Sequence, residues 1–209
     1  MIEVRDIFQI KFGKIDQAVD LFKRLPGVAA AQGAPFPYRY NVLTDISGGM
    51  YTLATELMFV SLAEWEVTRE QQYSQPEFAE WFRGFEALVE TGRQEYYTVE
   101  GECAQWSRPG VAVIRQIFRA LQWQIRPAVS LLQRYGALMV DSGVGRNPRV
   151  LTDLSGPMFT AVIELETSDM AEWETHRRSM FQRPEFQVWF LQLCNHVDAG
   201  AHEFFRVEV

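Results

Sequence analysis

Hydrophobic and polar positions alternate along the first segment of the chain, from Ile2 to Lys11. A period of two residues is typical of a β-strand with one buried face. The next segment, KIDQAVDLFKRL, spaces its apolar residues three and four apart, which predicts an amphipathic helix that ends at Pro26-Gly27. Two further strands are predicted over residues 38–46 and 50–59, because a Ser-Gly-Gly turn separates two strand-like runs there.

A second helix and a fourth strand complete this pattern. Ser61 and Glu64 have the spacing of a capping box, which predicts the start of a helix. Gln75-Pro76 predicts a break in that helix, which we expect to resume and to reach about Glu90. A last strand is predicted over residues 94–100. The order of elements is therefore βαββαβ, the ferredoxin-like pattern.

The whole pattern occurs twice. The phrase LTDISGGMYT, which begins at Leu43, returns 108 residues later as LTDLSGPMFT at Leu151. The same spacing joins AEWE at 63 to AEWE at 171, and PEF at 76 to PEF at 184. Near the N-terminus the spacing is 110 residues, so that Arg5 aligns with Arg115. The chain is thus a tandem duplication, with a first repeat over 1–100, a linker over 101–110 and a second repeat over 111–209.

Duplication solves a burial problem. A four-stranded sheet with both helices on one face leaves its other face uncovered, and a second copy can cover it. The fold class we predict is α+β: two tandem ferredoxin-like βαββαβ repeats that pack sheet to sheet as an intrachain dimeric α/β barrel.

Three features carry a resemblance to a known family. They are the repeated βαββαβ order, the Glu-Trp pair at the start of the second helix (Glu64-Trp65 and Glu172-Trp173) and the Pro-Glu-Phe break. Over nearly all its length the chain resembles the dimeric α/β-barrel superfamily, and most closely a NIPSNAP-like duplicated member. The resemblance implies the fold. It leaves the activity open, since similar proteins include cofactor-free monooxygenases, haem-degrading enzymes, isomerases and uncharacterised proteins.

The composition limits the classes of partner that we expect the protein to bind. The chain has 209 residues and a formal net charge of −7, and it lacks the basic surface that nucleic-acid binding needs. No apolar run approaches the ~18 residues of a membrane span, and the N-terminus does not read as a secretory signal. The two cysteines, Cys103 and Cys194, do not suggest a disulfide framework. We expect a cytoplasmic protein, a monomer or homodimer, with no nucleic-acid or membrane partner and with room for a small-molecule ligand.

Strand alternation sorts the polar residues into faces. In the first strand Val4, Phe8 and Ile10 are expected to face the helices, which turns Arg5 to the opposite face. The first and third strands of a ferredoxin-like sheet are antiparallel neighbours, so Arg5 is expected to lie beside Glu56. The candidate ligand-binding residues on this face are Arg5, Glu56 and Asn41 in the first repeat, and Arg115, Glu164 and Arg149 in the second.

Two interpretations of this set stay open. Buried charges persist when they are paired, so the arginines and glutamates could be paired charges that fix how the two sheets meet. Alternatively, they form the floor of a polar cavity between the halves and bind an anionic or carbonyl-bearing molecule. The exchange of Asn41 for Arg149 would make the halves of such a cavity unequal, although drift at a strand end explains it equally well.

Other groups of residues give weaker evidence for a functional site. Trp65 and Arg69 are spaced for a cation–π contact, but packing of the tryptophan onto the sheet explains the motif better. The aromatic stripe that includes Tyr73, Trp81, Phe82 and Phe85, and its counterpart Phe181, Trp189 and Phe190, reads as core packing. Asp45 and Asp153 read as turn formers.

The histidines give no strong signal for a metal or a cofactor. Cys194, Asp198 and His202 recur at intervals of four residues, yet Gly200 should end a helix before His202. Some haem-degrading enzymes of the superfamily place a histidine on the second helix, where His176 would lie. They also use an asparagine on the first strand, which this sequence lacks. We therefore expect no metal and no cofactor.

Two functional hypotheses remain, and no nucleophile or phosphate-binding motif decides between them. The first is a small-molecule-binding protein with a cavity between two ferredoxin-like halves, with a cofactor-independent monooxygenase or isomerase as the activity. The second is a non-catalytic interaction or assembly module of NIPSNAP-like type. A cavity large enough for a metabolite would distinguish the first from the second.

Overall fold

The structure, a computed structural model, describes residues 1–31, 39–102 and 105–209. The chain divides into two compact units, the first made of Met1–Tyr96 with Glu208–Val209 and the second of Tyr97–Val207. Tyr38, where the second strand was expected to begin, and Cys103 lie outside the described residues. The limits expected for the two repeats stay a prediction, because they mark where the duplicated sequence begins and ends.

The first repeat has the predicted order of elements. Its elements are β1 (Ile2–Ile10), α1 (Ile15–Ala31), β2 (Arg39–Ser47), β3 (Thr52–Phe59), α2 (Leu62–Tyr73), α3 (Pro76–Glu86) and β4 (Val89–Val99). The predicted break is present, since α2 ends at Tyr73 and Pro76 opens α3. The helix stops at Glu86 rather than Glu90, and the last strand begins at Val89 rather than Gln94.

The second repeat follows the same order. Its elements are β5 (Ala112–Ala120), α4 (Ile125–Asp141), β6 (Arg146–Asp153), β7 (Thr160–Thr167), α5 (Met170–Met180), α6 (Pro184–Cys194) and β8 (Val197–Val207). The predicted cap is confirmed, since the Ser61 hydroxyl accepts from the Glu64 N–H at 3.2 Å. In the second repeat the Asp169 carboxylate takes the same role and accepts from the Glu172 N–H at 2.8 Å.

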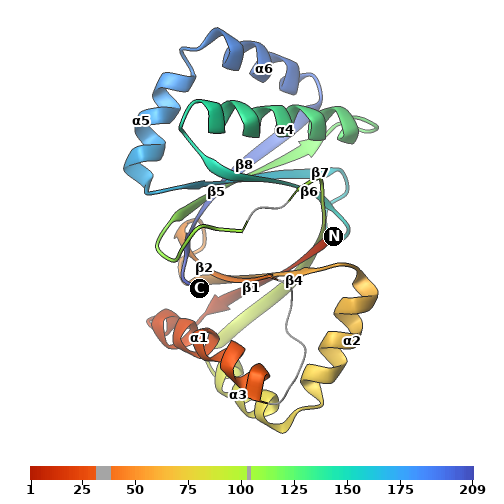
Figure 1. The fold of residues 1–209 in the computed structure, drawn as a ribbon, viewed down its shortest axis with the longest axis vertical. Coiled ribbons are helices and arrows are strands. Elements are labelled where there is room, and N and C mark those ends of the chain that lie inside the picture. Colours follow the sequence, from red (N-terminus) through yellow and green to blue (C-terminus); the bar gives the residue numbers. More distant parts are fainter. Residues whose placement is uncertain (32–38, 103–104) are drawn as a thin grey trace. The chain divides into compact units, whose positions relative to one another are not determined.

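Each unit contains a sheet with its helices on one face (Figure 1). The strand order is β4-β1-β3-β2 in the first unit and β8-β5-β7-β6 in the second. Two short segments belong to the compact unit of the other repeat. Tyr97–Val99, at the end of β4, pair with β6 in the second unit, and Glu208–Val209, which follow β8, bond to Val42 of β2 in the first.

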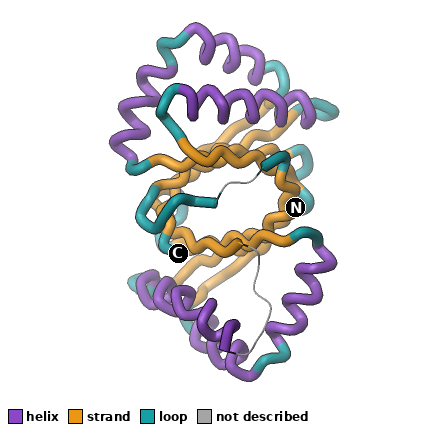
Figure 2. Tube along the Cα trace, viewed as in Figure 1, coloured by secondary structure: helices purple, strands orange, loops and turns teal. Residues whose placement is uncertain are grey.

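Helices and strands form two layers in each unit (Figure 2). The apolar core of each unit contains side chains from both layers. In the first unit Ile10 and Leu53, from the sheet, pack with Ala18 and Phe22 of α1 and with Phe85 of α3. The second unit repeats this arrangement with a larger cluster that includes Ile114, Leu132, Tyr135, Ile163 and Trp189. The predicted helix-facing sides of the strands are therefore confirmed.

Helix α1 continues through Pro26, so the expectation that Pro26-Gly27 ends the helix is wrong. Proline has no backbone N–H, and the carbonyl of Phe22 consequently loses its usual helical donor. The Tyr40 hydroxyl, from β2, donates to this carbonyl at 3.3 Å. A tertiary contact thus supplies the donor that the local sequence removes.

The two hairpins confirm the role predicted for the aspartates. The Asp45 carboxylate accepts from the Thr52 N–H at 2.7 Å, and Asp153 accepts from the Thr160 N–H at 2.8 Å. Each bond closes the loop at the start of the following strand. Within the described part of the chain, every helix is too short or too polar to cross a membrane.

Candidate functional site

The structure pairs the predicted charged residues of the first repeat. Arg5 lies opposite Glu56 in the ladder of β1 and β3, and its Nη1 donates to Glu56 Oε1 at 2.6 Å. Asn41, on β2, donates from Nδ2 to the other carboxylate oxygen at 3.2 Å. All three side chains are buried. The expected contact between Arg5 and Glu56 is confirmed, and Asn41 joins it.

The second repeat builds the same pair with an additional cation. Arg115 Nη1 donates to Glu164 Oε1, and Arg149 Nη1 lies 3.8 Å from Glu164 Oε2. The guanidinium of Arg149 lies 3.5 Å from the ring centroid of Trp106, a cation–π geometry. Arg115 lies 5.0 Å from the ring centroid of Tyr97. Arg149 occupies the place of Asn41, and the two repeats therefore differ in charge at this position.

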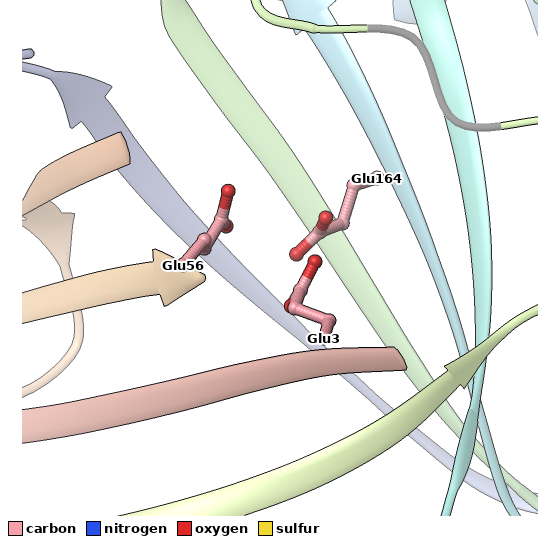
Figure 3. A group of neighbouring side chains, drawn as sticks. All are labelled: Glu3, Glu56 and Glu164. Atoms are coloured by element: carbon pink, nitrogen blue, oxygen red, sulfur yellow. The ribbon is translucent and has the colours of Figure 1, made fainter. Parts of the chain in front are cut away.

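These contacts agree with the interpretation of the set as paired charges, since Glu56 and Glu164 each accept from an arginine and Glu56 also accepts from the Asn41 amide. Figure 3 draws Glu56 and a carboxylate that was not predicted, Glu3 of β1, together with Glu164. The Glu3 side chain is buried, and alternation along β1 puts it on the same face as Arg5. Ligand binding by the six predicted residues stays a prediction.

A cavity lies on the other, helix-facing side of the first sheet. Its volume is about 390 Å³, within the ~300–1,000 Å³ that is usual for small-molecule sites. The sheet supplies its floor, and α1, α2 and α3 supply aromatic walls. Among the described residues, nine aromatic side chains line it: Phe8, Phe22, Tyr40, Trp65, Tyr73, Phe78, Trp81, Phe82 and Phe85. Part of the aromatic stripe predicted to be core packing therefore borders open space.

Asp6 forms the polar end of this cavity. Its carboxylate accepts from Gln94 Nε2 at 2.6 Å and from Thr55 Oγ1 at 3.3 Å. Burial raises the pKa of Asp6 above its ordinary value, although these two hydrogen bonds and the nearby charge of Arg69 act in the opposite direction. A carboxylate of this kind accepts a proton more readily than one in water.

A chain of hydrogen bonds orients Asp6. Trp65 Nε1 donates to the Tyr96 hydroxyl at 3.3 Å, and Tyr96 donates to Gln94 Oε1. The amide orientation of Gln94 is thereby fixed, so that its Nε2 points at Asp6. Trp65 also packs on Phe59, with ring centroids 5.3 Å apart, which confirms its packing role. Arg69 lies over Tyr73 rather than over Trp65.

Sequence reasoning did not select Asp6. The residue lies in the stripe Val4-Asp6-Phe8-Ile10, whose other members were assigned to the helix-facing core. One feature of the sequence could have identified it: Asp6 is a single carboxylate among apolar residues that face the core. A buried charge needs either a bonding partner or a functional role. Gln94 gave no signal, since its place beside Asp6 depends on the pairing of β4 with β1.

The second unit has a smaller cavity at the equivalent place, with a volume of about 250 Å³. Gln116 of β5 takes the position of Asp6, and His202 of β8 takes that of Gln94. Tyr135 of α4 replaces Leu25 and fills part of the space, stacked on Trp189 with centroids 4.3 Å apart. Arg177 is retained as the counterpart of Arg69.

The helix that was expected to end at Gly200, before His202, ends earlier. Cys194 ends α6, whereas Asp198 and His202 lie in β8, so their spacing of four residues has no helical meaning. His196 Nδ1 lies 2.8 Å from Gln124 Oε1, and His176 lies on α5. The structure brings His202, and neither of the other two histidines, to the lining of the second cavity.

Comparison with solved structures identifies the fold. The alignment with a candidate monooxygenase from Fusobacterium nucleatum covers 100% of this chain and 92% of that protein's chain, at a TM-score of 0.72 and 9% sequence identity. An anthrone oxidase-like protein covers 99% of this chain and 90% of its own, at 0.68 and 13% identity. A NIPSNAP-domain protein from Burkholderia xenovorans covers 50% of this chain and 100% of its own, at 0.44 and 15% identity.

No protein-family profile matches the sequence, and no curated protein sequence matches it either. The structural likeness at these identities establishes the fold alone. The predicted dimeric α/β-barrel fold, with two ferredoxin-like repeats, is thereby confirmed.

Proposed function

We propose that the first unit binds an apolar, ring-containing small molecule in the cavity above Asp6, and that Asp6 takes a proton from it. The observation that carries this proposal is the raised pKa of a carboxylate at the polar end of an aromatic-lined cavity of about 390 Å³. The walls suit stacking with a planar ligand. The carboxylate suits a hydroxyl or an acidic C–H group on that ligand.

The chemistry that follows is proton abstraction. Removal of a proton by Asp6 leaves an electron-rich anion on the ligand, stabilised by the cation of Arg69, which also lines the cavity. Return of the proton to another atom of the ligand completes an isomerase reaction. In a cofactor-independent monooxygenase reaction, molecular oxygen adds to the anion, the peroxide takes up a proton, and loss of water leaves one oxygen atom on the ligand as a carbonyl. The structural neighbours described as candidate monooxygenases favour the second reaction, and oxygen consumption distinguishes the two.

The experiment has two parts. Native and denaturing mass spectra of the purified protein are expected to reveal a co-purified ligand and its chemical class. Calorimetric titration with 2-naphthol, a planar hydroxyl-bearing probe, then compares the wild type with Asp6→Asn. Loss of the charged acceptor is expected to weaken binding by about tenfold, the difference between a charged and a neutral hydrogen bond.

Asp20→Asn is the matched control, because Asp20 is an exposed carboxylate on α1 that does not line the cavity. It is expected to bind 2-naphthol like the wild type. If the wild type binds no probe and carries no ligand, or if Asp6→Asn binds as well as the wild type, the proposal fails. The NIPSNAP-like interaction module then becomes the better hypothesis.

A further inference from the structure

The second unit has lost the carboxylate of the first cavity and gained donors in its place. Gln116 stands where Asp6 stands in the first repeat, so an amide replaces an anion at the floor. Tyr135 stands where Leu25 stands, so a hydroxyl replaces an apolar side chain. Both side chains are buried, and both line the cavity.

The hydrogen bonding of Tyr135 leaves a donor available. Gln116 Nε2 donates to the Tyr135 hydroxyl oxygen at 3.5 Å, so the hydroxyl acts as acceptor in this contact. Among the described residues the hydroxyl proton of Tyr135 meets no acceptor. Burial raises the pKa of Tyr135 well above its ordinary value, and the group therefore stays protonated at neutral pH.

Arg177 supplies the positive charge. Its guanidinium lies 5.0 Å from the ring centroid of Phe181, and within the described part of the chain it makes no salt bridge. In the first cavity Arg69 shares the site with the anion Asp6, and the other lining arginine, Arg93, pairs with Glu95 at 3.0 Å. Of the described residues that line the second cavity beside Arg177, none is a carboxylate.

We propose that the second cavity is a separate binding site for a small aromatic carboxylate. The ring would stack against Trp189 and Phe186, and the carboxylate would lie between the Tyr135 hydroxyl and the Arg177 guanidinium. The volume of about 250 Å³ is below the ~300–1,000 Å³ usual for drug-sized ligands, which limits the ligand to one or two fused rings. The site lacks a counterpart of the Asp6 carboxylate, so it binds the anion without taking a proton from it.

His202 reports on the occupied site. Its pKa is lowered, first by burial and then by the charge of Arg177. A bound carboxylate offsets the charge of Arg177, and the pKa of His202 should then rise. The shift can be followed by NMR of the imidazole carbons.

The test compares 2-naphthoate with 2-naphthamide, which has nearly the same shape and no charge. Calorimetric titration is expected to show tighter binding of 2-naphthoate to the wild type. Arg177→Gln and Tyr135→Phe should each weaken 2-naphthoate binding by about three- to tenfold, the range for a partly exposed ion pair or one charged hydrogen bond. Neither change should alter 2-naphthamide binding by more than about twofold.

Arg178→Gln is the matched control: Arg178 lies next to Arg177 on α5, is exposed and does not line the cavity, so 2-naphthoate binding should stay unchanged. The proposal is overturned if 2-naphthoate binds no better than 2-naphthamide, or if Arg178→Gln weakens its binding as much as Arg177→Gln. It is also overturned if saturating 2-naphthoate leaves the His202 titration unchanged. Arg177 is exposed, so Arg177→Gln should fold normally. This variant therefore tests the proposal even if Tyr135→Phe lowers stability. The result is independent of Asp6, which belongs to the other cavity.

Discussion

Replacing Arg5 by methionine tests whether the buried charges serve stability or ligand binding. Methionine keeps a long apolar side chain on β1 and removes the guanidinium. Arg5 Nη1 and Glu56 Oε1 are 2.6 Å apart, and the two side chains are only 1% and 0% exposed. The substitution therefore takes away the cation from a carboxylate that water does not reach.

The expected cost is large. Removing one partner of a buried ion pair costs about 3–5 kcal/mol, because the remaining charge is no longer compensated. The whole free energy of unfolding of a domain is about 5–15 kcal/mol, so Arg5→Met should be close to the limit of folding. The double variant Arg5→Met with Glu56→Gln removes both charges and should recover most of the loss, since Asn41 can still donate to the glutamine oxygen.

Urea denaturation, followed by tryptophan fluorescence and circular dichroism, measures these costs and the coupling between the two positions. Titration with 2-naphthol checks binding in the same variants. We expect the two single changes to lower stability, the double variant to regain it, and probe binding by the folded protein to stay unchanged. A cost below about 1 kcal/mol for Arg5→Met, or additive effects of the two changes, would refute a stabilising pair.

Two further predictions concern pH. Hydrogen bonds from the Ser168 hydroxyl and N–H lower the pKa of Glu172 from 4.5 to about 2, so its stabilising effect is complete above 4.5 and disappears as the pH falls to about 2. Glu172→Gln should therefore lower stability by about 1–2 kcal/mol at pH 7 and by nothing at pH 2. Glu64→Gln should cost less, because it neutralises a carboxylate that, in the described part of the chain, accepts a bond from the Val60 N–H alone. The pKa of Asp6 is raised in the folded protein, so stability is lost as the pH rises from the ordinary carboxyl pKa to this raised pKa. Asp6→Asn should therefore melt at a higher temperature than the wild type at pH 8 and at the same temperature at pH 3. A lower melting temperature of Asp6→Asn at pH 8 would contradict this.

The sequence by itself determined the architecture. The repeated phrases located the duplication, and hydrophobic periodicity located the strands and helices, because both are properties of consecutive residues. Alternation along β1 and β3, together with the ferredoxin-like order in which these strands are antiparallel neighbours, was sufficient to place Arg5 beside Glu56. The capping residues Ser61 and Glu64 also act locally, and the structure shows the bond expected between them.

Only the tertiary structure decided where open space lies. The aromatic residues of α3 have the same spacing in the sequence whether they fill a core or line a cavity. The distance between the helix and the sheet decides which of the two occurs. Asp6 and Gln94 are 88 positions apart in the chain, and they meet because β4 pairs beside β1. In the same way, Pro26 does not end α1 because Tyr40 reaches the carbonyl of Phe22. Such contacts between distant segments depend on packing, which local patterns do not encode.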